Sequence, residues 1–177
     1  MNLFRRFVGA LVLDPAAFED IEADAYANLQ AVIVVAASAA AAAFAMVSVK
    51  GLSLQPTFAI ALAGAAGAWI IWAMLISAVG TMMVPETQTR SSPVELFRTI
   101  GFAAAPGVFY ALAAMPATAP FITTLVTAWL MAATIIAVRQ ALDYRSTLRA
   151  VAVCLIASTI FGAVGFLVAT LFTASVS

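Results

Sequence analysis

Residues 51–85 read GLSLQPTFAIALAGAAGAWIIWAMLISAVGTMMVP and contain no Asp, Glu, Lys or Arg. A membrane-crossing α-helix needs about 20 predominantly apolar residues, so this stretch is long enough to span a bilayer. Three further stretches are free of charge and also long enough: residues 25–49, 99–138 and 150–177. Residues 99–138 cover about twice that length and can hold two spans. The sequence therefore predicts an all-α membrane protein, a bundle of five transmembrane helices.

Composition points to the same class of protein. Apolar residues make up 65% of the chain, charged residues make up 9%, and the mean hydropathy is +1.11. A soluble domain is typically about half apolar and about one quarter charged. The net charge is zero, so a nucleic-acid partner has no electrostatic support. The chain has no His and one Cys, and we expect no catalytic site, no metal site and no cofactor.

Charged and proline-containing segments divide the apolar sequence into helices. The predicted spans are residues 29–49, 56–84, a third from residue 94 to a turn at 115–120, then 121–138 and 150–174. The chain then has two parts: an amphipathic interfacial or cytoplasmic segment at 1–28, and a five-helix transmembrane domain at 29–177. The lipid bilayer is the first expected partner.

The basic residues predict the orientation of the bundle. Five spans place seven of the eight on one side of the membrane: Arg5, Arg6, Arg90, Arg98, Arg139, Arg145 and Arg149. Because basic residues are retained on the cytoplasmic side, we expect a multi-pass protein of the cell (inner) membrane with its N-terminus in the cytoplasm and its C-terminus outside. In the alternative, residues 99–138 form a re-entrant hairpin between four spans, and the charges are separated less well.

The first 28 residues predict two amphipathic helices. In residues 1–13 apolar side chains recur at helical spacing, so we expect a helix lying in the membrane interface with Arg5 and Arg6 toward lipid phosphates. The alternative is a frayed terminus. Asp14 and Pro15 predict the start of a second helix, which runs into the first span. That helix is acidic and carries Glu19, Asp20, Glu22 and Asp24.

We expect the acidic helix to fold back over the basic connectors. An anionic leaflet repels it, and two basic connectors attract it. They carry Arg90, Arg98, Arg139, Arg145 and Arg149. Exposed ion pairs contribute only about 0–1 kcal/mol each, so docking also requires burial of Phe18 and Ile21. The alternative is that these charges are simply solvated.

Residues 101–107 interrupt the third span. Pro106 has no N–H to donate to the carbonyl of Phe102, which predicts a kink. Gly101 and Gly107 flank the kink and allow close approach of a neighbouring helix. The kink indicates either packing, since Gly and Pro are frequent in membrane helices, or a broken helix that lines a substrate path.

The cytoplasmic ends of the spans carry the candidate site. Arg139 and Asp143 are four residues apart, within reach of an ion pair on a helix, and Tyr144 suits a membrane interface. The pattern predicts a face for an anionic lipid headgroup or for the acidic segment of a protein partner, or else ordinary anchoring. The residues of this predicted face are Arg90, Glu95, Arg98, Arg139, Asp143, Tyr144, Arg145 and Arg149.

Small and aromatic residues within the spans predict helix packing. Three tryptophans fall near the middle of their spans: Trp69, Trp72 and Trp129. Small-residue faces indicate packing within the chain first and contact in a homo-oligomer second. They comprise Gly64, Gly67 and Ala68 in the second span, and Ser158, Gly162 and Gly165 in the fifth.

Two segments resemble a known family. Residues 95–107, ELFRTIGFAAAPG, and residues 137–151, AVRQALDYRSTLRAV, resemble bacterial members of the Yip family, as does the entry at 14–31. These are multispan membrane proteins related to the eukaryotic Ypt/Rab-interacting proteins. The resemblance covers most of the chain and implies five spans with a cytoplasmic N-terminus, and it brings no catalytic residue. The long N-terminal region of the eukaryotic members is reduced here, so their link to Rab GTPases does not transfer.

Together these features favour a non-enzymatic membrane protein that organises the membrane or binds a partner through its cytoplasmic face. The main alternative is a small transporter or channel, with the kinked third helix lining the path. A lipid-modifying enzyme that uses Glu95 and Asp143 is a third possibility, which the absence of His disfavours.

Overall fold

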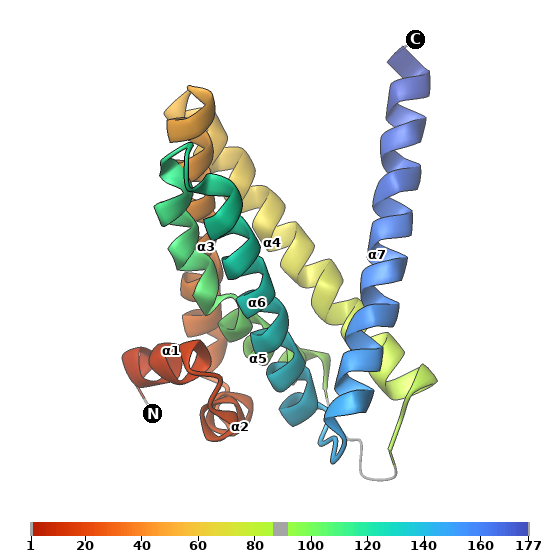
Figure 1. The fold of residues 1–177 in the computed structure, drawn as a ribbon. Coiled ribbons are helices and arrows are strands. Elements are labelled where there is room, and N and C mark those ends of the chain that lie inside the picture. Colours follow the sequence, from red (N-terminus) through yellow and green to blue (C-terminus); the bar gives the residue numbers. More distant parts are fainter. Residues whose placement is uncertain (1, 87–91, 177) are drawn as a thin grey trace.

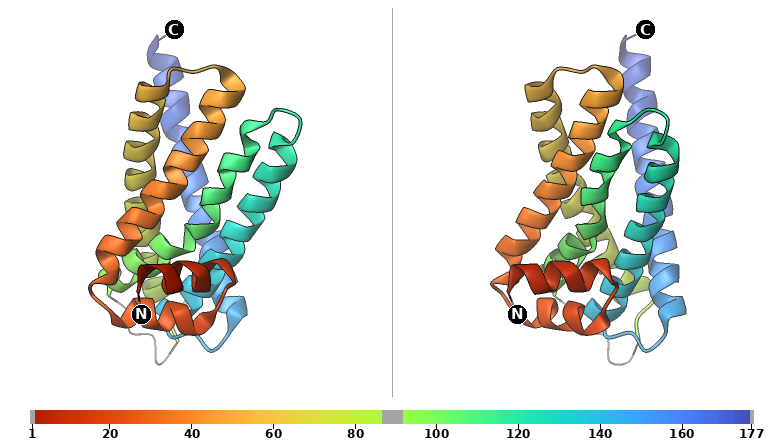
Figure 2. Two further views of the ribbon diagram at one scale, coloured as in Figure 1. Left: turned by 90° about the vertical axis from the view of Figure 1, so that its left-hand side faces the viewer. Right: turned by 60° about the vertical axis from the view of Figure 1, so that its left-hand side comes forward.

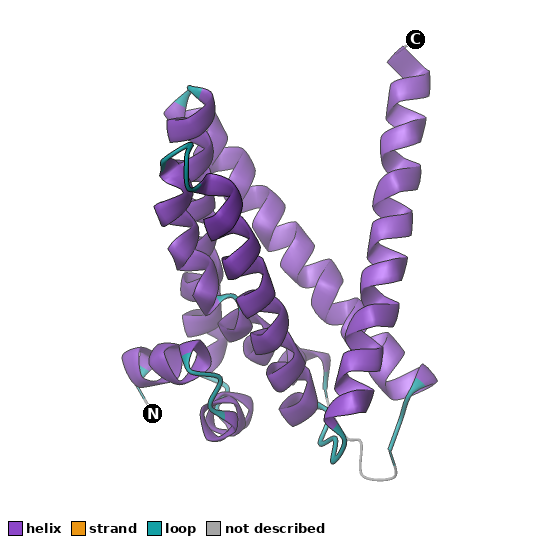
Figure 3. Cartoon of the chain, in the orientation of Figure 1, coloured by secondary structure: helices purple, strands orange, loops and turns teal. Residues whose placement is uncertain are grey.

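The computed structural model describes residues 2–86 and 92–176, and within these ranges the chain is helical with short connectors (Figure 3). The elements are α1 (Leu3–Leu11), α2 (Pro15–Ala23), α3 (Ala27–Lys50), α4 (Leu54–Ala78), the π-helix η1 (Val79–Met83), α5 (Pro93–Ala103), the 3₁₀-helix η2 (Ala105–Ala114), α6 (Ala119–Ala141) and α7 (Thr147–Val176).

Five helical segments are long and apolar enough to cross a membrane, which confirms the predicted all-α membrane bundle. They are Ala27–Lys50, Leu54–Met83, Pro93–Ala114, Ala119–Ala141 and Thr147–Leu167. Residues 99–138, which the four-span alternative treats as a re-entrant hairpin, belong to two separate helices of spanning length.

The spans form a bundle that is closed at one end and open at the other (Figures 1 and 2). Helices α3, η2 and α6 lie side by side, and α7 diverges from them toward its C-terminus. Helices α1 and α2 cross one end of the bundle, near the N-terminus. We call this the basic end, which also holds the start of α5 and the connector 142–146. The opposite end, with the connectors 51–53 and 115–118, is the far end.

The acidic helix α2 does not run into the first span, and this prediction is wrong. Helix α2 ends at Ala23, because the backbone of Asp24 is extended, with ψ of 110°. The Asp24 carboxylate accepts a hydrogen bond from the backbone N–H of Tyr26 at 2.9 Å, which turns the chain into α3. The start of α2 is as predicted, because Asp14 accepts from the N–H of Ala16 and Pro15 takes the first position.

The third span, formed by α5 and η2, lies at the centre of the bundle. In its apolar 18-residue stretch 61% of the residues are buried, whereas in the corresponding stretches of the other spans 11–22% are buried. Its α-helix ends at Ala103, and the chain continues as a 3₁₀-helix from Ala105, next to Pro106. The carbonyl of Ala104 at this break accepts the hydroxyl of Ser38 on α3 at 2.6 Å. The same carbonyl also accepts the backbone N–H of Gly107 at 2.8 Å, so the Ser38 bond is an additional tie between α3 and the break.

Glycines permit close contact on both sides of the break. A Cβ on Gly107 would lie 2.8 Å from the Cβ of Ser38, and a Cβ on Gly101 would lie 2.7 Å from the Cβ of Ala31. Both distances are shorter than side chains tolerate, so α3 packs this closely on the third span only because these positions lack side chains. The glycines flanking the break are therefore packing positions against the first span.

Most of the buried apolar side chains lie toward the basic end. One cluster joins Phe18 and Ile21 of α2 to Phe102 of α5, and all three are fully buried. The predicted burial of Phe18 and Ile21 is thus confirmed, and it is worth about 1.5–3 kcal/mol for each side chain removed from water. A second cluster includes Ile76 of α4 and Leu142 of the connector. Apolar burial thus holds α2 and the connector 142–146 to the spans.

Candidate functional site

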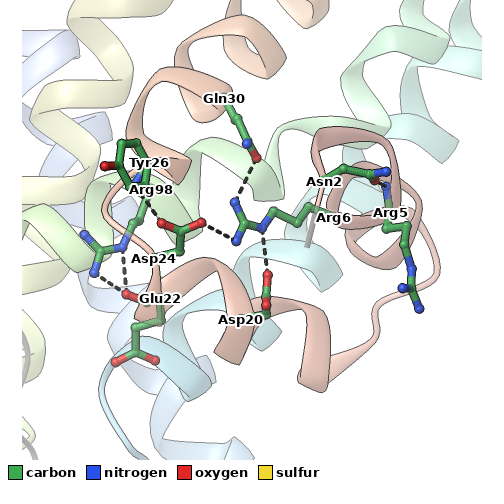
Figure 4. A network of polar contacts seen from close by, with 9 residues as sticks. All are labelled: Asn2, Arg5, Arg6, Asp20, Glu22, Asp24, Tyr26, Gln30 and Arg98. Atoms are coloured by element: carbon green, nitrogen blue, oxygen red, sulfur yellow. Dashed lines mark hydrogen bonds and ion pairs between the residues drawn. The ribbon is translucent and has the colours of Figure 1, made fainter.

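A buried arginine ties α1 to α2 and α3 (Figure 4). The guanidinium of Arg6 donates from Nε to Asp20 at 2.7 Å, from Nη2 to Asp24 at 2.6 Å and from Nη1 to Gln30 at 3.0 Å. Asp20 and Asp24 are four residues apart, so they present two carboxylates toward one cation. The Arg6 residue is fully buried. The prediction that Arg6 points to lipid phosphates is therefore wrong, while Arg5 is exposed.

These ion pairs hold both aspartates in the charged form. The hydrogen bond from Arg6, with that from the backbone of Tyr26, lowers the pKa of Asp24 below its ordinary value. Burial works to raise the pKa of Asp20, but the hydrogen bond and charge of Arg6 outweigh it, and the pKa is lowered. The α1–α2 pairing therefore persists into the acidic range.

A second arginine joins α5 to the end of α2. Arg98 is 7% exposed, and its Nε donates to the backbone carbonyl of Glu22 at 2.7 Å, with Nη2 donating to the same oxygen. A cation in this position satisfies a free carbonyl and complements the negative end of the helix. Glu95 lies 4.0 Å from Arg98 and also closes a capping box with Ser92 at the start of α5. The predicted site residues Glu95 and Arg98 are thus joined to the acidic helix.

The side chain of Glu22 is in an unusual environment for a carboxylate. Burial raises the pKa of Glu22 to about 7, and the negative charges of Asp143, Glu95 and Glu19 add to this rise, while Arg98 opposes it. The acids that add to this rise belong to α2, α5 and the connector 142–146. Their influence on Glu22 could not be predicted from the sequence, because these segments are far apart in the chain.

The acidic helix docks, and among the described residues Arg98 is the predicted basic partner that bonds to it, at the Glu22 carbonyl. Glu19 accepts a hydrogen bond from the amide of Gln140 on α6 at 2.7 Å. Asp20 and Asp24 form ion pairs with Arg6. Arg145 and Arg149 bind Glu86 instead. The Nε of Arg149 is 3.3 Å from one Glu86 carboxylate oxygen, and the backbone N–H of Arg145 donates to the other at 3.3 Å. The expected pairing of α2 with Arg145 and Arg149 is therefore wrong.

Tyr144 lies in the connector at the ends of the spans and is buried within the protein, and its interfacial position stays a prediction. Tyr144 is only 3% exposed, and its hydroxyl group donates to the carbonyls of Gly80 and Val84, both at 2.8 Å. A π-helix leaves such carbonyls without their usual partners, because its hydrogen bonds span one residue more than those of an α-helix. A Cβ on Gly80 would lie 2.4 Å from the side chain of Leu142, so a glycine is needed there. The connector thus locks the end of the second span.

The remaining predicted residues lie at the same connector. The Nε of Arg139 donates to the carbonyl of Tyr144 at 3.4 Å, and Asp143 adopts a left-handed backbone with φ of 53°. Arg149 also donates to the carbonyl of Pro85 at 2.9 Å. Arg90 lies outside the described residues. The described residues of the predicted face therefore form two groups, one on α5 and one on the connector 142–146 with the adjoining ends of α6 and α7.

A tryptophan connects the first helix to the fourth span. The Nε1 of Trp129 on α6 donates to the carbonyl of Leu11 at the end of α1 at 2.9 Å, and its ring stacks on Phe109 with centroids 5.3 Å apart. Trp69 likewise donates to the carbonyl of Phe97 at 3.0 Å. The tryptophans therefore pack as expected and also carry hydrogen bonds between elements.

An apolar cavity of about 410 Å³ lies beside the break in the third span. The break contributes Ala103, Ala104 and Gly107, and the other helices contribute aromatic and small side chains, including Trp72 of α4 and Phe161 of α7. The rings of Trp72 and Phe161 meet edge to face, with centroids 6.0 Å apart. The cavity size falls within the usual range of small-molecule sites, about 300–1,000 Å³.

The small-residue faces of the second and fifth spans do not pack within the chain. Among the described residues, no neighbouring atom lies within 4 Å of a Cβ built at any of four glycines: Gly64, Gly67, Gly162 and Gly165. Packing within the chain is therefore the wrong interpretation of these glycines. Contact in a homo-oligomer remains a prediction.

The chain was compared with protein-family models, with curated proteins and with solved structures, and none of them matches. The function of the protein must therefore be inferred from its fold and from the geometry of the site. They define a polytopic membrane protein with five spans and a polar assembly at one end.

Proposed function

We propose that the protein is a non-enzymatic membrane protein of the Yip type that binds a protein partner through its basic end, on the cytoplasmic side of a bacterial inner membrane. The observation that carries this proposal is the fixed position of α2. Its buried side chains, Phe18 and Ile21, and its internal bonds to Arg6 and Arg98 hold it across the ends of the spans. A helix held this rigidly outside the spans offers a preformed surface for association.

The exposed charges suit a protein partner better than an anionic lipid. The outer surface of the basic end exposes Glu19 on α2, and Asp143 and Arg145 on the connector 142–146. The two acids repel a lipid phosphate, and the basic Arg149 already lies beside Glu86. A protein surface with both signs of charge can complement such a face, and that complementarity gives specificity and association rate.

Site-specific photocrosslinking in native membranes tests this proposal. A photoreactive residue at Glu19 or at Arg145 should give the same adduct, whereas one at the exposed Gln55 of the far end should not. Charge reversal by Arg145→Glu should weaken the adduct formed from position 19, because it disturbs the same face. An adduct of equal yield from Gln55, or none from either basic-end position, contradicts the proposal.

The cavity beside the broken helix supports a second candidate function, passage of a small apolar solute. The third span changes helix type where it borders the cavity, as broken helices do at the binding sites of transporters. Reconstituted protein should then release an apolar fluorescent solute from liposomes, and Ala68→Trp, which fills the cavity from α4, should abolish release. The same substitution at the open Gly64 is the control. Equal release with and without the protein excludes this function.

A further inference from the structure

Helix α1 lies alongside the spans and not beyond their ends. Figures 1 and 2 show it crossing the bundle at a level nearer the far end than α2. The carbonyl of Leu11 at its end accepts a hydrogen bond from Trp129, which is near the middle of α6 (Ala119–Ala141). A rise of 1.5 Å per residue places the Cα of Trp129 roughly 18 Å from the basic end of α6. Because the spans cross the bilayer, α1 is at the depth of one leaflet.

The side of α1 that faces away from the protein is apolar, with one cation at its edge. Phe4, Val8 and Val12 recur every four residues and are 73%, 38% and 69% exposed. Arg5 is exposed as well, and Figure 4 shows its side chain directed away from Arg6 and the partners of Arg6. No ion pair among the described residues includes Arg5. A helix face in contact with water would instead carry mainly polar and charged side chains.

An apolar hollow of about 460 Å³ lies where α1 meets α3, and we call it the α1–α3 hollow. Phe4 and Phe7 line it from α1, and Ile33 and Ala37 line it from α3. Asn2 also lines it, but the side-chain oxygen of Asn2 is already used as the N-cap of α1. The volume falls within the usual range of small-molecule sites, about 300–1,000 Å³. The hollow therefore offers a ligand apolar contacts and little hydrogen bonding.

The hollow, the exposed stripe and the free cation follow one another around α1. Successive residues of an α-helix are turned by about 100°, so Val8 lies between Phe4 and Arg5 when α1 is viewed along its axis. Gly9, one turn after Arg5, is where α1 packs on Ala17 of α2, so Arg5 is on the side of α1 nearer to α2 and the basic end. The hollow is on the other side of Phe4, against the first span. A phospholipid has the same order, from its phosphate to its acyl chains.

We propose that α1 and α3 bind one phospholipid of the leaflet at the basic end. Its phosphate pairs with Arg5, and one acyl chain passes over Val8 into the α1–α3 hollow. The guanidinium group of arginine matches the geometry of a phosphate and binds it by charge-assisted hydrogen bonds. The unpaired cation favours a phospholipid over an apolar solute, and the hollow favours it over a free phosphate. The site uses none of the charges assigned to the protein partner, so it stands apart from the proposed function.

Photocrosslinking tests the apolar part of the site. The probe is a phosphatidylglycerol with a diazirine near the end of one acyl chain, in nanodiscs made with this lipid. We expect adducts on Phe7, which is half-buried and borders the hollow. Ala37→Trp fills the hollow from an exposed position on α3 and should remove most of these adducts, whereas Ala63→Trp, at an exposed position on α4, should leave their yield unchanged. Absence of adducts on Phe7, or an equal yield after Ala37→Trp, overturns the proposal.

Native mass spectrometry tests the polar part on its own. The full chain in detergent is titrated with phosphatidylglycerol, and we expect one lipid to bind first. Arg5→Gln should weaken its binding about tenfold, as loss of one charged hydrogen bond does. Lys50→Gln, which removes an exposed cation at the far end, should leave the binding unchanged, and excess inorganic phosphate should not displace the lipid. Equal weakening by both substitutions, no weakening by Arg5→Gln, or displacement by phosphate overturns the proposal.

Discussion

At the basic end of the bundle Arg6 is fully buried and reaches three polar side chains, whereas at the far end no neighbouring atom approaches Gly162 or Gly165 among the described residues. The two ends differ in the interactions that can hold their helices together. Apolar side chains gain little when they leave lipid for protein, so the far end has no strong reason to close. Ion pairs and hydrogen bonds outside the hydrocarbon core of the membrane do fix the positions of the helices that they join. In this chain, the few polar residues therefore determine where the non-spanning helices lie.

Removal of Arg6 should have the largest effect on the basic end. Arg6→Ala removes the guanidinium that pairs with Asp20 and Asp24, and breaking a fully buried ion pair costs about 3–5 kcal/mol. The aspartate side chains are 33% and 32% exposed, so we expect a smaller loss of about 2–3 kcal/mol in the free energy of unfolding. Denaturant titration in detergent micelles measures it. Arg5→Ala, one residue earlier and exposed, should change it by less than about 0.5 kcal/mol. Equal losses for the two variants contradict this account.

Alanine substitutions at glycines compare the two ends directly. Gly101→Ala places a Cβ 2.7 Å from Ala31 and 3.0 Å from the ring of Trp69, so overpacking should cost about 1–3 kcal/mol. Gly162→Ala meets no neighbour and should cost less than about 0.5 kcal/mol. Thermal unfolding of both variants in the same detergent gives the comparison. A destabilising Gly162→Ala would show that the far end packs more tightly than described.

Loss of the Tyr144 hydroxyl should lower the free energy of unfolding more than loss of the Tyr110 hydroxyl. Tyr144→Phe removes the donor shared by two carbonyls of the second span, and buried unsatisfied groups cost about 1–3 kcal/mol, so we expect about 1–2 kcal/mol. Tyr110→Phe removes one bond to Thr127, and such bonds within a membrane average about 0.6 kcal/mol. Unfolding measurements on both variants test the order, and a reversed order would remove the proposed lock on the π-helix.

Acid should loosen α1. The pKa values of Asp20 and Asp24 are lowered from an ordinary 3.8 by pairing with Arg6, so their contribution is complete above about pH 4 and is lost as pH falls further. Hydrogen exchange of the α1 amides between pH 5 and pH 3 should show the loss in the natural protein. Arg6→Ala should show a smaller step, because the Arg6 pairs are gone while the backbone N–H of Tyr26 still lowers the pKa of Asp24.

The sequence was sufficient to predict the spans but not the contacts between the helix ends. Long apolar runs predict spanning helices because each helix satisfies its own backbone, whatever its neighbours. Arg6 was misassigned because its partners follow it by 14 and 18 residues, across a turn. The available signal was the position of Asp20 near the end of α2 and of Asp24 directly after it, since two acids this close in the chain can pair with one cation. Burial of Tyr144 has no such local signal, because it depends on the π-helix formed 60 residues earlier.

A thiol-specific cross-link tests most directly whether α2 is docked where the structure places it. The ends of the Glu19 and Gln140 side chains are 2.7 Å apart, whereas the sequence alone had suggested Arg145 and Arg149 as partners of α2. In a Cys154→Ala background, Glu19→Cys with Gln140→Cys should be joined by a short bis-maleimide in native membranes, because the reagent replaces the length of the two side chains, and Glu19→Cys with Arg149→Cys should be joined far less. Preferential cross-linking to position 149, or none to position 140, would contradict the docked basic end.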